Sequence, residues 1–326
     1  MIPKGGIYML KAIWNKILEY DVIVISRHVR PDGDASGAQM GLKYLIQANT
    51  KNKVIYCDGE PNSYAGKIVG NVDTNINIKD DVKYLSIIVD TPNISRIDGT
   101  LYKKASEVIK IDHHIFVEEF GGIEYIDTSA CAASLLIARL AKENKLKVNK
   151  KCALALYTGI VTDSNRFLYE GVNSETFEIA RFLVSRNINI FEMYDYLYET
   201  DLNSLKFKGY CMNNVKVSEE GFAYNIFKKE ELESLGVSAN QAAGNVNCIA
   251  NIKDVHIHAH FAEVEEGVIR VELRSKKIPV NFIATKYGGG GHKLASGAQV
   301  KSFKDVENMI MDINDLIRET FNDEIR

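Results

Sequence analysis

The sequence lacks the features that would predict long disordered segments, membrane-spanning helices or export. It contains only five prolines and no low-complexity tract, which argues against long disordered segments. No apolar run approaches the length of a membrane span, so we expect no membrane partner. The start, MIPKGGIYMLKAIWNK, lacks the long apolar core of a signal peptide, and we therefore expect a cytoplasmic protein.

Cysteines and net charge restrict the function further. The five cysteines are odd in number, scattered, and form no CxxC pair, so we expect buried, reduced thiols. The formal net charge of -3 is a poor match to a protein that binds long duplex nucleic acid, because a basic face supplies most of that affinity. A small nucleotide remains compatible, because bound metal ions can supply positive charge locally.

The first half of the chain alternates short apolar runs with helical patterns. The predicted strands are 22–26, 53–57, 84–89 and 107–111, and the predicted helices are 36–47, 130–142 and 151–161. Fully apolar, β-branched strands separated by helices are typical of a parallel sheet covered on both faces. The fold class is therefore α/β, with a doubly wound, mainly parallel N-terminal sheet.

The pattern changes in the second half. A helical region rich in Phe, Leu and Tyr extends from about 174 to 210, and segments 221–227, 254–264 and 267–273 then alternate like half-buried strands. A helix over 304–318 closes the chain. We predict an N-terminal domain at 1–188, a helical linker at 189–209, and a smaller mixed α/β domain at 210–326.

Acidic and histidine residues follow three of the predicted strands. The run 22–26 leads into Arg27-His28-Val29-Arg30-Pro31-Asp32-Gly33-Asp34, the run 84–89 into Asp90, and the run 107–111 into Asp112-His113-His114. The helix at 151–161 leads into Asp163. Ligands bind beyond the carboxyl ends of parallel strands, so these side chains should gather at one edge of the sheet.

A metal site explains this gathering better than separate structural roles do. One aspartate after a strand is usually a cap or turn residue, but clustered carboxylates repel unless their charge is offset. The candidate ligands are His28, Asp32, Asp34, Asp90, His113 and Asp163. Mixed oxygen and nitrogen donors suit a pair of divalent ions, Mn²⁺ or Mg²⁺ above all, and the absence of cysteine from these loops argues against structural zinc.

The order of these motifs resembles that of a known superfamily. In chain order they are His28-x-x-x-Asp32-x-Asp34, Val89-Asp90-Thr91, Asp112-His113-His114 and Thr158-Gly159-Ile160-x-x-Asp163. The set is similar to that of the DHH phosphoesterases. The later Gly288-Gly289-Gly290-Gly291-His292 and Ala295-Ser296-Gly297-Ala298 resemble the DHH-associated C-terminal domain. The compact two-domain chain is most similar to the NrnA-type nanoRNase and pAp phosphatase branch.

The resemblance implies a ligand arrangement for two ions, Mn²⁺ or alternatively Mg²⁺. His28 and Asp32 would hold one ion. Asp34, His113 and Asp163 would hold the other.

The resemblance also implies three catalytic positions. Asp90 would bridge the two metals, and His114 would contact the substrate phosphate. Asp112 would orient the imidazoles from behind the ligands, as ligating histidines generally require.

The second domain would hold the nucleotide. A run of glycines lets backbone N–H groups turn toward an anion, although a flexible turn between a helix and a strand explains the run nearly as well. With the resemblance, we favour substrate binding by Arg274, Gly289, Gly290, Gly291 and His292.

The implied activity is hydrolysis of short 5′-phosphorylated oligoribonucleotides, from di- to tetranucleotides, and of pAp to AMP. The alternatives are a phosphodiesterase for cyclic or linear dinucleotides (c-di-AMP, pApA or pGpG), a pyrophosphatase, and a catalytically weak nucleotide-binding regulator. The glycine-rich second domain argues against pyrophosphate, and the intact ligand set argues against the regulator. Related proteins make a homodimer plausible.

Three other patterns look functional but have simpler interpretations. His256, His258 and His260 would share one face of a strand, which we interpret as solvent-facing or partly covered and without function. Asp127 should cap the helix predicted at 130–142. The aromatic stretch 191–198 should serve linker-helix packing or a dimer contact rather than base stacking.

Overall fold

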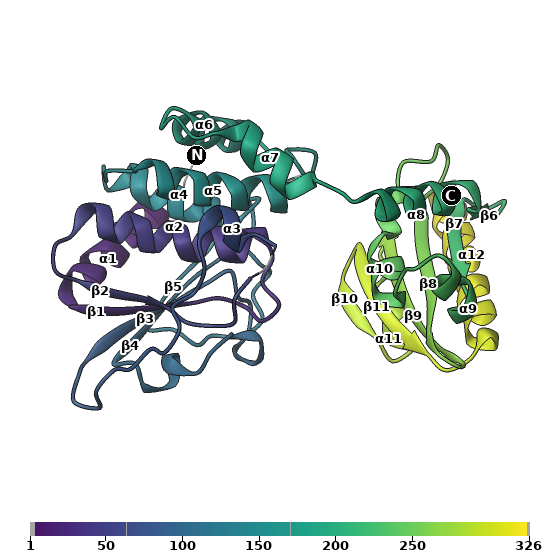
Figure 1. The fold of residues 1–326 in the computed structure, drawn as a ribbon, viewed down its shortest axis with the longest axis horizontal. Coiled ribbons are helices and arrows are strands. Elements are labelled where there is room, and N and C mark those ends of the chain that lie inside the picture. Colours follow the sequence, from purple (N-terminus) through teal and green to yellow (C-terminus); the bar gives the residue numbers. More distant parts are fainter. Residues whose placement is uncertain (1–3, 63, 170, 325–326) are drawn as a thin grey trace. The chain divides into compact units, whose positions relative to one another are not determined.

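Two compact units make up the protein in a computed structural model that describes residues 4–62, 64–169 and 171–324 (Figure 1). The first unit is Met1–Glu199 and the second is Thr200–Arg326. Within the described ranges, no helix has the length and apolar character needed to cross a membrane.

The first unit is built on a five-stranded parallel sheet. Its strands are β1 (Val22–Ser26), β2 (Val54–Cys57), β3 (Tyr84–Val89), β4 (Glu107–Asp112) and β5 (Ile123–Ile126). Their order across the sheet is β2-β1-β3-β4-β5, and every pair is parallel. The predicted α/β class with a parallel N-terminal sheet is confirmed, and all strand ends that carry predicted ligands lie at one edge.

Helices cover one face of this sheet. The helices are α1 (Lys4–Glu19), α2 (Gly33–Asn49), α3 (Gly66–Val69), α4 (Ala133–Glu143), α5 (Lys150–Asp163), α6 (Ser174–Val184) and α7 (Ile190–Tyr198). Helices α1, α2 and α4 contact the strands, while α5 packs on α2 and α4 (Figure 1). The core between these layers is almost entirely aliphatic.

The other face of the sheet is covered by shorter segments. The 3₁₀ helices η1 (Ile94–Arg96) and η2 (Leu101–Lys104) follow β3, and η2 contacts β1 and β3. Lys110 of β4 is fully buried on this side, where its ammonium donates to the Pro92 carbonyl at 2.9 Å and lies 4.3 Å from the ring centroid of Phe120. These contacts offset the desolvation of the buried charge.

The second unit is a smaller mixed α/β fold, as predicted. Its strands are β6 (Lys216–Val217), β7 (Phe222–Phe227), β8 (Ile257–Glu265), β9 (Val268–Ser275), β10 (Gly290–His292) and β11 (Ala295–Val300), in the order β10-β11-β9-β8-β7-β6. Only β7 and β8 pair in parallel. The remaining elements are α8 (Leu202–Asn213), α9 (Lys229–Ser234), α10 (Ala239–Gly244), η3 (Val246–Ile249), α11 (Asn281–Lys286) and α12 (Phe303–Glu324).

The division between the units falls inside the segment for which we predicted a linker, 189–209. Helix α7 belongs to the first unit, because Met193 and Leu197 are buried in its core. Helix α8 belongs to the second unit, where Phe207 and Cys211 are buried. The apolar residues of this stretch therefore serve two separate cores, and the chain changes units between α7 and α8.

The prediction for the histidines of β8 was wrong. His258 and His260 are buried, with 5% and 0% of their surface exposed, whereas we expected a solvent-facing or partly covered side. Helix α10 and η3 pack on that side of the strand, so both of its faces are covered. His256 precedes the strand and lies against the ring of Phe321, with 4.4 Å between the ring centroids.

The prediction for Asp127 was also wrong. Helix α4 begins at Ala133, after Ala132, and so starts later than expected. Asp127 instead accepts a hydrogen bond from the guanidinium of Arg139 at 2.6 Å. The amides at the start of α4 bind the carboxylate of Asp34 from a distant part of the chain.

Close packing of α2 against α5 depends on glycine. A Cβ atom at Gly37 would lie 2.5 Å from the carbonyl oxygen of Ala155 and 2.9 Å from the amide of Gly159, which are backbone atoms that cannot rotate away. The Gly37→Ala variant should therefore force the helices apart and lower the free energy of unfolding by about 1–3 kcal/mol.

Trp14 makes this measurable, because the single tryptophan of the chain lies in the core of the first unit. We expect urea unfolding followed by its fluorescence to show a lower midpoint for Gly37→Ala. Gly209→Ala is the control, since nothing lies within 4 Å of a Cβ there and the residue is helical. Equal midpoints for both variants would contradict the close-packing argument.

Candidate metal centre

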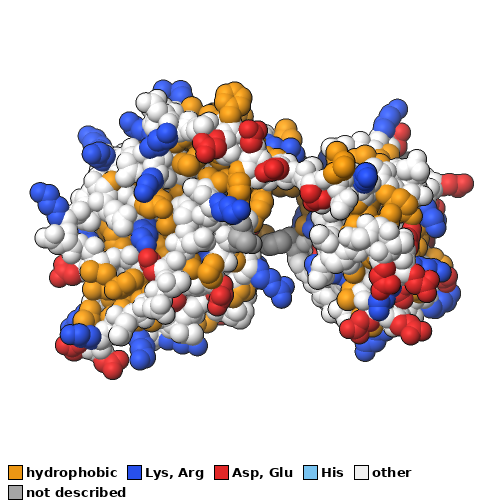
Figure 2. All heavy atoms as spheres, viewed as in Figure 1, with side chains coloured by type: hydrophobic (Ala, Val, Ile, Leu, Met, Phe, Trp, Pro, Cys, Tyr) orange, Lys and Arg blue, Asp and Glu red, His pale blue; other side chains and the backbone are white. Residues whose placement is uncertain are grey.

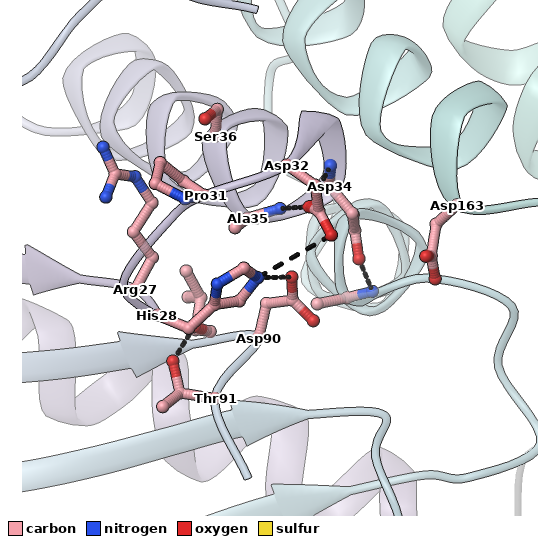
Figure 3. Close-up of polar contacts among 12 residues, drawn as sticks. Arg27, His28, Pro31, Asp32, Asp34, Ala35, Ser36, Asp90, Thr91 and Asp163 are labelled. Carbon is pink, nitrogen blue, oxygen red and sulfur yellow. Dashed lines mark hydrogen bonds and ion pairs between the residues drawn. The ribbon is translucent and has the colours of Figure 1, made fainter. Parts of the chain in front are cut away.

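Six side chains meet at the carboxyl edge of the parallel sheet, and Figure 3 labels all of them except His113. They come from the ends of β1, β3 and β4, the start of α2, and the end of α5. The six residues are His28, Asp32, Asp34, Asp90, His113 and Asp163, and their donor atoms form two groups that could each hold a metal ion. The structure thus brings together all the ligands predicted from the sequence.

The first group consists of His28, Asp32 and Asp90. Nε2 of His28 lies 3.7 Å from Oδ2 of Asp32 and 3.5 Å from Oδ2 of Asp90, and Figure 3 shows the ring directed at both carboxylates. The other ring nitrogen, Nδ1, lies 2.9 Å from the carbonyl oxygen of Val29. A proton on Nδ1 satisfies that carbonyl and leaves the lone pair of Nε2 toward the carboxylates.

The second group consists of Asp34, His113 and Asp163. Nε2 of His113 lies 3.9 Å from Oδ2 of Asp34 and 3.3 Å from Oδ2 of Asp163. Its Nδ1 lies 3.2 Å from the carbonyl oxygen of Ala130. Both histidines are therefore held by a backbone carbonyl, in the way that fixes the tautomer of ligating histidines.

Asp90 lies between the two groups. Its Oδ2 is 3.5 Å from Nε2 of His28, and its Oδ1 is 3.3 Å from Nε2 of His113. The carboxylate is only 2% exposed, and among the described residues its Oδ1 accepts no hydrogen bond of normal geometry. The backbone of Asp90 has a φ of 51°, a left-handed conformation that costs energy outside glycine and often marks functional sites.

Helix N-termini hold two more carboxylates of the centre in place, the exposed Asp32 and the buried Asp34. Asp32 caps α2, accepting hydrogen bonds from the amides of Asp34 and Ala35, both at 2.9 Å. Asp34 accepts from the amides of Ala133 at 2.6 Å and Ser134 at 2.9 Å, at the start of α4. The positive ends of two helices thus stabilise both negative charges. The role of Ala133 and Ser134 could not be predicted from sequence, because it uses only their backbone amides.

Asp112 orients the neighbouring histidine. Its Oδ1 accepts from the amide of His113 at 2.9 Å and lies 2.8 Å from Nδ1 of His114. The carboxylate therefore fixes the ring of His114, while the ring of His113 is held by the carbonyl of Ala130 instead. His114 also approaches the centre, with its Nδ1 3.6 Å from Oδ1 of Asp90.

A buried arginine supports the loop that carries His28 and Asp32, and the sequence analysis missed it. Arg27 donates to Oδ2 of Asp98 at 2.6 Å and to the carbonyl of Glu60 at 2.5 Å. Only 1% of its surface is exposed, so the ion pair with Asp98 fixes the start of the loop. The one available signal was its position next to His28, which does not identify a partner so distant in sequence.

The electrostatics of the centre require added positive charge. Burial alone would lower the pKa values of His28 and His113, but the surrounding carboxylates raise both to about 10. Burial, together with other carboxylates, raises the pKa of Asp34 to about 7 and that of Asp163 to about 8. The two histidines oppose burial at Asp90 and hold its pKa below the usual range. Protons therefore balance the carboxylates where cations are absent.

The donor set fits divalent metal ions. It combines carboxylate oxygens with imidazole nitrogens whose tautomers are fixed by backbone carbonyls, and one buried carboxylate oxygen lacks a hydrogen-bond donor in the described part of the chain. Such mixed oxygen and nitrogen donors suit hard or borderline ions. The geometry further places one oxygen of Asp90 toward each group, as a shared ligand would require.

The substrate residues predicted for the second unit lie on two of its strands, except Gly289, which immediately precedes β10. Arg274 of β9 is 28% exposed at its side chain, with Nη1 3.2 Å from Oε2 of Glu272. Gly290 and Gly291 are part of β10, where they pair with Gly297 and Ser296 of β11. The glycine run is therefore partly a strand rather than only a loop.

Close backbone contact explains why glycine is needed there. A Cβ at Gly289 would lie 2.1 Å from the carbonyl of Gly297, and Gly291 has a φ of 141°. The backbone of His292 pairs with Ala295, and its side chain lies outside the described part of the structure.

Known proteins share both units. The model of the DHH family, N-terminal domain, matches residues 22–160, and that of the DHHA1 domain matches residues 221–323. A Bacillus subtilis protein named bifunctional oligoribonuclease and PAP phosphatase NrnA is 36% identical over 306 residues, covering 92% of this chain and 96% of that protein. A Mycoplasma genitalium protein of the same name is 38% identical, with 95% and 98% covered.

A solved structure shares the complete fold. The crystal structure of an exopolyphosphatase-related protein from Bacteroides fragilis matches with a TM-score of 0.83 and 25% sequence identity. The match covers 95% of this chain and 98% of that chain.

Metal binding should release protons. Because His28 and His113 have pKa values of about 10 without metal, and Asp34 and Asp163 about 7 and 8, a cation must displace protons from these groups. We expect Mn²⁺ affinity to fall by about tenfold per pH unit for each proton released as the pH is lowered.

Isothermal titration calorimetry in two buffers with different protonation enthalpies measures this release. The observed enthalpy should depend on the buffer, and affinity should decline through the range in which Asp163 and Asp34 gain protons. Asp163→Asn removes one of these protons and should flatten the pH dependence. An affinity independent of pH and buffer would contradict the assigned protonation states.

Proposed function

Because this chain belongs to the DHH family, we propose that it hydrolyses short 5′-phosphorylated oligoribonucleotides, from di- to tetranucleotides, and converts pAp to AMP. The relatives named oligoribonuclease and PAP phosphatase match nearly the whole chain, so neither unit of those proteins is lacking here. One observation supports this chemistry: the buried carboxylate of Asp90 belongs to the group of His28 and directs its other oxygen at His113 of the second group. This arrangement supports a metal-dependent hydrolase.

We assign two Mn²⁺ ions to the centre, with Mg²⁺ as the alternative. His28 and Asp32 would hold one ion. Asp34, His113 and Asp163 would hold the other. When bound, two such ions supply Lewis-acid activation of water and of the phosphate ester.

Asp90 would serve as the ligand common to both ions. Its two oxygens face opposite groups, and its buried position at the end of β3 keeps bulk water from competing for them. A shared carboxylate fixes the separation of the two cations, which in-line displacement at phosphorus requires.

His114 would hold a phosphate oxygen of the substrate by a hydrogen bond. Asp112 accepts from Nδ1 of its ring at 2.8 Å, which limits rotation, so the hydrogen bond to phosphate would be donated by Nε2 of the imidazolium form. The carboxylate also stabilises positive charge on the imidazole as negative charge develops on the phosphoryl oxygens. Asp112 is thus a positioning residue and His114 the group that contacts substrate.

The second unit would hold the remainder of the nucleotide. Arg274, the glycines Gly289, Gly290 and Gly291, and His292 are the assigned contacts. The partly exposed guanidinium supplies a cation, and the glycine strand allows close approach of a ligand to backbone amides.

Surface charge favours small substrates. Figure 2 shows acidic and basic side chains mixed over the viewed face of each unit, without one continuous basic surface. Long duplex nucleic acid is bound mainly through such basic surfaces, so we propose no role in binding it. A cytoplasmic location and a homodimeric state are part of the proposal and can be tested by cell fractionation and light scattering.

The activity test compares three substrates with the Mn²⁺-loaded protein. A 5′-phosphorylated RNA dinucleotide, pAp and cyclic di-AMP are incubated in parallel, and products are separated chromatographically. We expect mononucleotides from the dinucleotide and AMP from pAp. Turnover of cyclic di-AMP alone would reassign the enzyme to dinucleotide signalling. Absence of all three products would overturn the proposal and favour a nucleotide-binding regulator.

Asp90→Asn should be the most damaging single change. Residues that hydrogen-bond to metal ligands without binding the metal typically contribute about 10–100-fold to metal affinity or activity. Loss of a shared ligand should therefore lower Mn²⁺-dependent turnover by at least about 100-fold. Asp80→Asn is a matched control, because that carboxylate is 96% exposed at the surface. Near-normal turnover by Asp90→Asn, measured on the dinucleotide at saturating Mn²⁺, would refute the shared-ligand role.

A further inference from the structure

A second cluster of metal-ligating side chains lies within the second unit. Cys211 of α8, Cys248 of η3 and His260 of β8 have donor atoms that all lie within 4.8 Å of one another. Cys211 and His260 are fully buried, while Cys248 is partly exposed, which differs from our expectation of five buried thiols. None of the three belongs to the centre in the first unit.

His260 has the tautomer that a metal ligand needs. Its Nδ1 lies 2.7 Å from the carbonyl oxygen of Ala242 and donates its proton there, so the lone pair is on Nε2. The ring is held from the side by Phe227, edge-on at 5.2 Å between centroids. Asn225 donates to Nε2 at 3.3 Å and to the Cys211 carbonyl at 3.1 Å, which shows that Nε2 accepts hydrogen bonds.

The cluster places two thiols beside the ring of His260. Both thiols would bind a metal as thiolates, and a divalent cation would offset their two negative charges. The thiolate is the form of cysteine that binds metals. Mostly apolar side chains of α8, α10 and β7 surround the cluster, so such a charge has little solvation on its buried side.

We propose that Cys211, Cys248 and His260 bind one borderline-soft divalent cation, Zn²⁺ foremost, and leave one coordination position open to solvent. Two thiolates and one imidazole nitrogen are a donor set that Zn²⁺ prefers, and the three donor atoms all lie within 4.8 Å of one another. The fourth position belongs to a water molecule, which can reach the ion beside the partly exposed Cys248. Binding converts both thiols to thiolates and releases their protons to solvent.

This site would fasten the start of the second unit to its sheet. Helix α8 is the first element after the division of the chain at Glu199, and β8 is a central strand. The ion would link that helix, η3 and the strand through one residue from each. The centre in the first unit differs in chemistry, because its ligands are only carboxylates and imidazoles.

Cobalt substitution separates the two centres in the full-length protein. Reduced, metal-free protein is titrated with Co²⁺, and the thiolate-to-cobalt charge-transfer absorption is recorded. We expect this absorption to appear in the wild-type protein and in Asp90→Asn, and to be lost in Cys248→Ser. Addition of Zn²⁺ should abolish it in the wild-type protein by displacing cobalt.

Cys131→Ala is the matched control, because Cys131 is a buried thiol of the first unit that contacts Thr176. It should retain the full absorption. Zn²⁺ should also raise the melting temperature of wild-type protein but not that of Cys248→Ser, which circular dichroism must first show to be folded. Absence of the thiolate absorption in fully reduced wild-type protein, or its persistence in Cys248→Ser, would overturn the site.

Discussion

The buried carboxylate of Asp90 is the contact on which the arrangement of the first unit depends. It lies at the end of the central strand β3, and each of its oxygens faces a histidine from a neighbouring strand end. The adjacent strands β1 and β4 deliver His28 and His113 to the same edge. A parallel sheet achieves this without any special loop, because all of its strands end on the same side. The left-handed backbone conformation of Asp90 costs energy, and strained residues of this kind occur mainly at functional sites.

In this unit the same contacts hold the helices together and place the candidate ligands. Asp34 lies in the first turn of α2 and accepts hydrogen bonds from the first amides of α4, so one carboxylate both completes a helix start and faces the metal centre. Glycines let α2 approach α5 closely enough to bring Asp163 toward Asp34: a Cβ at Gly159 would lie 2.7 Å from Oδ1 of that carboxylate. Stability and ligand geometry therefore cannot be changed independently at this contact.

Much of the first unit could be predicted from sequence because its signals are local. The strands 22–26 and 84–89 are apolar except for one buried serine each, they match β1 and β3 residue for residue, and the candidate ligands follow them closely. Glycine-rich β10 carries no strand signal, since its pairing comes from the antiparallel partner β11. Periodicity showed which histidines share a face of β8 but not that α10 and η3 cover that face. The meeting of Cys211, Cys248 and His260 is likewise invisible in sequence, because it depends on how three separate elements pack.

Charge balance explains how such an acidic centre can form before it binds metal. At slightly acidic pH, protons on His28, His113, Asp34 and Asp163 together carry the same charge as the two proposed divalent cations. Loading the centre therefore exchanges protons for metal ions and leaves the total charge nearly unchanged. Repulsion among the carboxylates does not oppose folding of the metal-free chain, because protons and the helix N-termini of α2 and α4 already offset it. What the metal ions change is where the positive charge lies: it moves from the ring and carboxyl protons to positions from which it can contact a phosphate ester.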